Sequence, residues 1–264
     1  MSCLPLQKGI LYGPIDSRRL GKSLGINLMP TGYKLCSFNC VYCHYGWTEV
    51  HALDAAPFIK DMPSHDDVVD AVESALKSRL EFDYLTFSGN GEPTLYPQFA
   101  TLVERISRSR DRCRPGLKIA LLSNSSGLGL PEVKSSIKYI DIPVFKLDAG
   151  NEDVFKSINR PFPGVSLDGI TANLRSLSGI MIQTVLVTGD PGNVGDEDLN
   201  EYFVRISDIK PQYVHIYSID RPVPNTSIAR VLPDELERIA ELGGSRTGVP
   251  FKAFFIKQQY GHGA

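Results

Sequence analysis

From residue 66 onward, short apolar segments alternate with amphipathic segments, and this alternation constrains the fold more than any other feature of the sequence. Apolar residues with helical periodicity predict helices at 66–80, 98–108, 166–178, 196–209 and 233–242, and a further helix is predicted to start at Pro131. The apolar runs between them predict strands at 84–88, 117–123, 140–147, 181–188, 213–219 and 250–256. In the first helix, acidic residues precede one apolar stripe formed by Val68, Val69, Val72, Leu76 and Leu80.

Such alternation implies parallel strands joined by right-handed crossovers. Five or six units form either a full or partial barrel or an open doubly wound sheet, and in each case the chemistry lies at the carboxyl ends of the strands. A further strand is predicted at 24–29, and residues 47–63 lack periodicity, as in a long loop over the site. A length of 264 residues predicts one domain over 1–264, with a core at about 20–220 and a C-terminal extension at 221–264.

Charge and hydropathy exclude several classes of protein. The 28 lysines and arginines against 30 acidic residues give a net charge of −2, which argues against binding nucleic acid mainly through bulk positive charge. No apolar run is long enough to span a membrane or to form the core of a signal peptide. We therefore expect a cytoplasmic protein with no membrane partner. In that reducing compartment, clustered cysteines bind metals or act in redox chemistry.

The segment C-S-F-N-C-V-Y-C holds three of the five cysteines, namely Cys36, Cys40 and Cys43. Three thiolates this close together can bind one compact soft centre, either an iron–sulfur cluster or zinc. A four-iron electron carrier uses four cysteines, and neither Cys3 nor Cys113 is near in sequence, so three ligands would leave one iron open to a small molecule. The zinc alternative would recruit His44, although adjacent residues rarely turn both side chains to one metal.

This cysteine spacing, with the aromatic Tyr42 before the last cysteine, resembles the radical S-adenosylmethionine (SAM) superfamily. The resemblance implies an α/β fold with a partial (β/α)6 barrel, a [4Fe–4S] cluster on the three cysteines, and SAM bound to the open iron. It also implies an external electron donor such as flavodoxin or ferredoxin. The electron cleaves SAM to a 5′-deoxyadenosyl radical, which abstracts hydrogen from a substrate. Tyr42 would then pack beside the adenine.

Polar motifs at three predicted strand ends extend this resemblance. Residues 87–93, F-S-G-N-G-E-P, are typical of a hairpin turn in isolation, but a helix pattern follows and they resemble the family's G-G-E-P motif, which meets the methionyl amino group of SAM. Residues 121–127, L-L-S-N-S-S-G, are typical of a helix cap. Residues 145–149, F-K-L-D-A, place an ion pair or ligand contacts on one strand face. The SAM contacts implied are Gly89, Asn90, Gly91, Glu92, Ser123, Asn124 and Asp148, with Lys146 at SAM or the substrate.

Residues 12–28, 182–189 and 215–222 resemble the branch related to wyosine-type tRNA base synthases. The resemblance makes a tRNA base the first candidate substrate. Those synthases carry a second upstream cysteine set, whereas only Cys3 precedes the motif here, so a second three-cysteine cluster cannot form from this chain alone. A small molecule or a peptide is the alternative substrate, and the net reaction is expected to be that of an oxidoreductase or a transferase. The alternative class of protein is a non-catalytic iron–sulfur or zinc module. Guanidinium groups match carboxylate or phosphate, so the candidates for binding an anionic substrate group are Arg18, Arg19 and Arg221.

Other residues give weaker signals. Five arginines between 105 and 114 crowd the end of a predicted helix, and we interpret them as a solvated face that complements the helix dipole rather than as an RNA contact. We interpret Cys113 as a surface thiol and Trp47 as loop packing. No ligand spacing relates the histidines His51, His65, His215 and His262.

Overall fold

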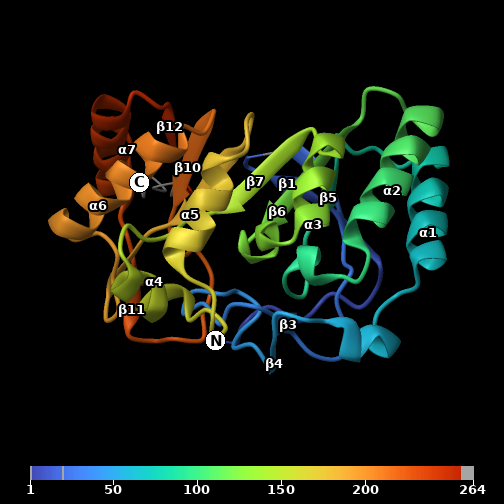
Figure 1. The fold of residues 1–264 in the computed structure, drawn as a ribbon, viewed down its shortest axis with the longest axis horizontal. Helices are drawn as coiled ribbons and strands as arrows, with labels where there is room; N and C mark the ends of the chain where they lie inside the picture. Colours follow the sequence, from blue (N-terminus) through green and yellow to red (C-terminus); the bar gives the residue numbers. More distant parts are fainter. Residues whose placement is uncertain (1, 20, 257–264) are drawn as a thin grey trace, which may run out of the picture.

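The computed structural model describes residues 2–19 and 21–256, and its centre is one curved eight-stranded sheet (Figure 1). Neighbouring strands are parallel except for β1 and β2, which form an antiparallel pair at one edge. The predicted α/β class with a partial barrel is confirmed, because the sheet curls but does not close: among the described residues, β1 and β12 are its two edge strands and do not pair with each other. In spatial order the strands are β1 Leu11–Ser17, β2 Gly21–Ile26, β5 Tyr84–Phe87, β6 Lys118–Ser123, β7 Ile142–Lys146, β8 Met181–Val185, β10 Tyr213–Tyr217 and β12 Phe251–Phe254.

Helices connect the parallel strands, with α1 and α2 beside one end of the sheet and α6 and α7 beside the other (Figure 1). Their bounds are α1 His65–Lys77, α2 Phe99–Cys113, α3 Pro131–Ser136, α4 Glu152–Asn159, α5 Leu167–Arg175, α6 Asp196–Ile209 and α7 Pro233–Thr247. The 3-10 turns are η1 Ala56–Asp61, η2 Pro93–Leu95, η3 Ser126–Gly129 and η4 Ile137–Tyr139. Two small sheets pair β3 Leu35–Cys36 with β4 Val50–His51, and β9 Val187–Gly189 with β11 Ile228–Arg230. Within the described ranges, none of the helices combines the length and apolar character needed to cross a membrane.

Helix α1 begins and ends where its polar residues satisfy the backbone. Ser64 and Asp67 form a capping box, in which each side chain accepts a hydrogen bond from the other residue's N–H. The apolar stripe from Val68 to Leu76 is buried, as predicted. The prediction that the helix reaches Leu80 is wrong. The Ser78 hydroxyl donates to a carbonyl of the last turn and accepts from the Leu80 N–H, so the chain leaves the helix and Leu80 is 41% exposed.

Residues 87–93 connect β5 to a helical segment rather than forming a hairpin, as the helix pattern after them predicts, because β5 lies between two parallel neighbours, β2 and β6. Two other sequence interpretations need correction. The strand predicted at 181–188 is two strands, β8 and β9, because the N–H of Leu186 donates to the Tyr217 carbonyl and the chain then pairs with β11. The segment predicted as a loop, 47–63, contains β4 and η1.

Of the five arginines at the end of α2, Arg108 and Arg112 are exposed, as expected of a solvated face, whereas Arg110 is an exception. Arg110 is buried, with Nη1 2.7 Å from Asp141 Oδ2 and 2.5 Å from the Leu117 carbonyl oxygen. Arg105 pairs with Asp66 at 2.7 Å, and Arg108 and Arg112 pair with glutamates. Cys113 is half-buried against the core. This run of cations therefore ties α2 to its neighbours.

The hydrophobic core fixes the strands whose ends carry the predicted motifs. Phe87, the last residue of β5, is fully buried, and its ring meets that of Phe99 on α2 edge to face at 5.5 Å. Trp47, predicted to pack in its loop, is 39% exposed, and the Arg160 guanidinium lies 4.8 Å from its ring centre. Of the weaker candidates, His262 and the last part of the predicted C-terminal extension lie outside the described residues.

Candidate functional site

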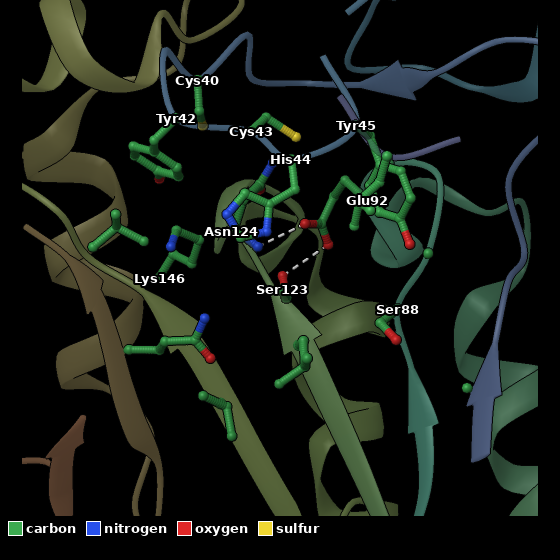
Figure 2. A pocket seen from close by; sticks show the side chains of 18 of the residues that line it. Cys40, Tyr42, Cys43, His44, Tyr45, Ser88, Glu92, Ser123, Asn124 and Lys146 are labelled. Carbon is green, nitrogen blue, oxygen red and sulfur yellow. Dashed lines mark hydrogen bonds between the residues drawn. The ribbon is translucent and has the colours of Figure 1, made fainter. Parts of the chain in front are cut away.

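A cavity of about 430 Å³ opens at the carboxyl ends of the parallel strands, against the loop that carries the clustered cysteines (Figure 2). Its lining comes from β1, β2 and the ends of β5, β6, β7, β8 and β10. Three predicted site residues, Arg18, Asn90 and Asp148, do not line it. The predicted residues that the fold brings together around it are Cys36, Cys40, Tyr42, Cys43, Gly89, Gly91, Glu92, Ser123, Asn124, Lys146, Arg19 and Arg221.

Cys36 is the last residue of β3, Cys40 and Cys43 lie on the loop that follows, and all three are free thiols. Cys36 and Cys40 are buried, and burial raises the pKa of the Cys36 thiol to about 12. Amide groups approach two of the sulfurs: Asn124 Nδ2 lies 3.6 Å from Cys36 Sγ and Asn159 Nδ2 lies 3.5 Å from Cys40 Sγ. Soft thiol donors on one loop beside an open cavity fit an iron–sulfur cluster whose remaining iron faces a ligand.

A buried lysine completes the surroundings of the thiols. Lys34 is 3% exposed, and its ammonium donates to the Gly46 carbonyl at 2.8 Å. Burial lowers the pKa of Lys34, but the charges of the three neighbouring cysteines raise it to a net value above the usual one. Lys34 thus supplies a positive charge where a cluster held by three thiolates would be negative.

The arrangement gives no support to a single zinc ion. Among the described residues, no group of three Cys, His, Asp or Glu side chains is arranged to hold one metal ion. His44, the ligand that zinc would recruit, lines the cavity and lies 3.9 Å from Asp220 Oδ1. A cluster differs from a single ion because each thiolate binds a different iron, so its ligands are spread more widely.

The Gly-rich turn after β5 packs directly against the cysteine loop. A Cβ on Gly91 would lie 1.6 Å from the Leu35 carbonyl oxygen, so only glycine fits there. The Leu35 N–H donates to the Asn90 carbonyl at 3.3 Å, and the Glu92 N–H donates to the Leu35 carbonyl at 3.4 Å. The cysteine loop and the turn are therefore one structural unit.

Glu92 organises the strand end beside this turn. Its buried carboxylate accepts from the Asn124 N–H at 2.6 Å and from the Ser123 hydroxyl at 2.8 Å (Figure 2). It also accepts from the Thr94 hydroxyl at 2.6 Å. Burial raises the pKa of Glu92, and these hydrogen bonds oppose the rise. Asn124 and Ser123 are thereby held at the cavity wall by a residue of the turn that follows the neighbouring strand, β5.

Asn90 differs from its neighbours because its side chain is already engaged. It is fully buried, its Nδ2 donates to the carbonyls of Gln7 and Pro30 at 2.9 Å, and its Oδ1 accepts from the Gln7 N–H at 2.7 Å. Asn90 thus attaches the N-terminal segment to the Gly-rich turn, and only its neighbours Gly89 and Gly91 face the cavity.

Tyr42 is held by a buried polar group. Its hydroxyl donates to Asp148 Oδ2, which also accepts from Asn159 Nδ2 at 2.7 Å. The other oxygen, Oδ1, accepts from the Val185 N–H at 2.8 Å and lies 3.4 Å from Lys146 Nζ. Asp148 is fully enclosed by these partners, so it orients Tyr42 and Lys146 toward the cavity rather than facing it.

Sequence reasoning missed several residues of the cavity wall. Tyr12 on β1 lies over Gly25, and its hydroxyl bonds to Ser88. Gln183 on β8 and Tyr217 on β10 face each other across the strands. The signal for Gln183 was a polar side chain inside an apolar run, I-Q-T-V-L-V, while Tyr12 and Tyr217 stood in segments quoted only for their resemblance.

The sequence matches the family model described as "Radical SAM superfamily" over residues 32–206, which is more than half of the chain. The chain therefore belongs to the Radical SAM superfamily. It is an enzyme of that superfamily and uses the general mechanism in which reductive cleavage of SAM starts radical chemistry. A [4Fe–4S] cluster and SAM are the cofactors that membership implies.

Relatives of similar sequence include a UPF0026 protein of Methanocaldococcus jannaschii. It is 31% identical over 239 residues, which cover 88% of this chain and 70% of that protein. A protein of Brachyspira hyodysenteriae named GTPase Obg is 31% identical over 232 residues, or 86% of this chain, but this chain spans only 32% of its length. Neither name confirms the wyosine-type branch.

Two of the solved structures with a similar fold are those of proteins from Sphaerobacter thermophilus and Streptococcus suis. A radical SAM methyltransferase from Sphaerobacter thermophilus has a TM-score of 0.61 at 16% identity, over 89% of this chain and 66% of that one. Streptococcus suis SuiB bound to S-adenosylmethionine has a TM-score of 0.62 at 15% identity, over 88% of this chain and 51% of that one. At such identities the likeness concerns the fold.

Proposed function

We propose that Cys36, Cys40 and Cys43 bind the [4Fe–4S] cluster and that the adjoining cavity binds SAM and the substrate. When bound, these cofactors supply a 5′-deoxyadenosyl radical that abstracts hydrogen from the substrate. The observation that carries the proposal is that three thiols, the Gly-rich turn and the Ser123–Asn124 strand end surround one cavity. An electron carrier would have no use for such a cavity.

The residues around the thiols divide into contact and positioning roles in this proposal. Gly89 and Gly91 leave backbone exposed to the methionyl end of SAM, and Ser123 and Asn124 offer polar groups to its ribose or carboxylate. Tyr42, fixed by its hydrogen bond to Asp148, packs beside the adenine. We assign positioning roles to Glu92, Asn90 and Asp148, which hold these groups through the hydrogen bonds described above.

Anaerobic reconstitution tests the proposal. The wild-type protein should bind about four irons per chain, and SAM with a reductant such as flavodoxin or dithionite should give 5′-deoxyadenosine. Cys40→Ala should lose both, whereas Cys113→Ala should keep both, because Cys113 lies at the end of α2 and does not line the cavity. Zinc in place of iron, with no 5′-deoxyadenosine, would refute the assignment.

We propose a tRNA base as the first substrate to test, with a small molecule or a peptide as the alternative. The tRNA proposal is supported by the resemblance of residues 12–28, 182–189 and 215–222 to the wyosine-type branch. The cavity of about 430 Å³ would also hold SAM in this proposal, so an RNA substrate would insert no more than a single extruded base. Product analysis with tRNA fractions and with cell extract distinguishes these substrates, since an unchanged RNA pool would favour the alternative.

A further inference from the structure

A polar cluster on the β7–β10 side of the cavity takes no part in the proposed SAM contacts. The Arg19 guanidinium lies 4.4 Å from the ring centre of Tyr217, and the Lys146 ammonium lies 5.6 Å from the same ring centre. Gln183 donates to the Tyr217 hydroxyl, and all four residues line the cavity. The Gly-rich turn and Ser123 lie instead on β5 and β6. The cavity therefore has a second polar wall.

The cations near this wall differ in whether a carboxylate neutralises them. Lys146 Nζ lies 3.4 Å from Asp148, and both Arg18 and Arg221 lie within ion-pair distance of Asp220. Arg19 forms no ion pair with residues 2–18 and 21–256, and its buried Nη1 has no hydrogen-bond partner there. A buried donor without an acceptor is unfavourable, and a bound acceptor would remove that cost.

The neighbouring titratable groups respond to this unneutralised charge. Burial raises the pKa of Tyr217, but the Lys146 and Arg19 charges outweigh it and bring the pKa below its usual value. The pKa of His215, two residues earlier on β10, falls to about 4, first through burial and then through the charges of Arg19 and Lys252. Both groups therefore lie in a positive potential that a bound anion would reduce.

We infer that Arg19, Lys146 and Tyr217 form a subsite for a monoanionic oxyanion group of the substrate. One unneutralised guanidinium matches one negative charge, and its free N–H, the ammonium and the phenol hydroxyl supply donors to an oxyanion. A carboxylate of a small molecule and a phosphodiester of a nucleic acid share this chemistry. The inference rests on the proposed function, because it assigns part of the same cavity to the molecule that the radical attacks.

Saturation-transfer NMR on the reconstituted protein, with and without SAM, tests this inference. The probes are acetate, dimethyl phosphate and, at about pH 8, methyl phosphate, which is then a dianion. We expect acetate or dimethyl phosphate to bind more tightly than methyl phosphate. Stronger binding of acetate would identify a small carboxylate as the source, and stronger binding of dimethyl phosphate would identify a nucleic-acid strand.

Two arginine variants make the test specific. Arg19→Gln should weaken binding of the monoanionic probe by about tenfold. Arg18→Gln makes the same change of charge one residue away, but Arg18 pairs with Asp220 outside the cavity lining, so binding should persist. Circular dichroism establishes that both variants are folded, and Tyr217→Phe, which keeps the ring beneath Arg19, provides a second variant that should bind more weakly.

Three outcomes would overturn the inference. They are no binding by the folded wild-type protein, equal losses in Arg18→Gln and Arg19→Gln, and displacement of the probe by SAM, which would assign the subsite to the SAM carboxylate. Formation of 5′-deoxyadenosine is measured separately. A protein that cleaves SAM but binds no monoanion would therefore refute this subsite and leave the proposed function intact.

Discussion

Replacing Gly91 by alanine should separate the cysteine loop from the Gly-rich turn. The added Cβ would lie 1.6 Å from the Leu35 carbonyl oxygen and 2.7 Å from its carbonyl carbon. Both atoms belong to backbone, which cannot rotate away as a flexible side chain can. The two segments must therefore move apart, and Leu35 immediately precedes Cys36, one of the three proposed cluster ligands.

The size of the effect follows from the two hydrogen bonds that join these segments. They measure 3.3 Å and 3.4 Å between heavy atoms, so a further separation of more than 1 Å breaks both. At about 0.5–1.5 kcal/mol each, with some buried groups left unpaired, the loss is about 2–3 kcal/mol. For a chain of this size that lowers Tm by about 4–12 °C.

Thermal melts followed by circular dichroism, together with iron content after reconstitution, measure this effect. Gly32→Ala is the matched control, because Gly32 precedes the same cysteine loop, has no atom within 4 Å of an added Cβ and has an ordinary φ. We expect Gly91→Ala to melt lower and to hold less iron than Gly32→Ala. Equal melting temperatures and equal iron content in the two variants would refute the packing argument.

Three other predictions follow from the same contacts. Cys40→Ala should lose iron but keep its circular dichroism spectrum, since Cys40 lies on a loop outside the sheet; global unfolding would instead indicate a structural metal. Burial raises the pKa of Asp141, but hydrogen bonds from the Ile119 N–H and from Arg110 bring it below 3.8. The ionised Asp141 carboxylate therefore stabilises the fold above pH 3.8, and this contribution is lost as the pH falls through the lower pKa of the folded state. In urea unfolding, Asp141→Asn should be less stable than wild type at neutral pH, and its stability should depend less on acid. Ionisation of Tyr217, which faces Arg19, Lys146 and Asp148, adds a negative charge to the cavity wall. Acetate binding measured by NMR should therefore decline as the pH rises through the pKa of Tyr217, and Tyr217→Phe should not show that decline.

The parts of the fold that sequence predicts well are those whose local chemistry agrees with the tertiary contacts. Helix α6 occupies the predicted residues 196–209, because acidic residues start it, an apolar stripe runs along it, and Lys210 ends it in a left-handed conformation. Strand β1 escaped prediction because Gly13 and Pro14 interrupt its alternation and its register shifts between Tyr12 and Ile15. Such a strand is specified by its pairing with β2 rather than by its own pattern.

The candidate site also contains residues that the local sequence predicts and residues that only tertiary contacts place. Spacing alone brings Cys36, Cys40 and Cys43 onto one loop, so the sequence predicts that they lie together. Nothing local distinguishes Arg18 from Arg19, because the first pairs with Asp220, two hundred residues away in sequence, and only the second faces the cavity. The environment of such a cation depends on contacts between segments that are far apart in the sequence, and local sequence patterns do not reveal these contacts.

The packing of the G-N-G-E-P turn also limits what mutations there can show about SAM. Gly91 is required by the Leu35 carbonyl, and Gly89 has a φ of +124° with a Cβ that would lie 2.5 Å from Asn27 Oδ1. Either glycine would therefore resist substitution even if no ligand approached it. Loss of SAM cleavage in a glycine variant consequently indicates a SAM contact only when melting temperature and iron content are unchanged. Ser123→Ala keeps the backbone conformation but removes a hydroxyl that donates to Glu92, so the same two controls apply to it.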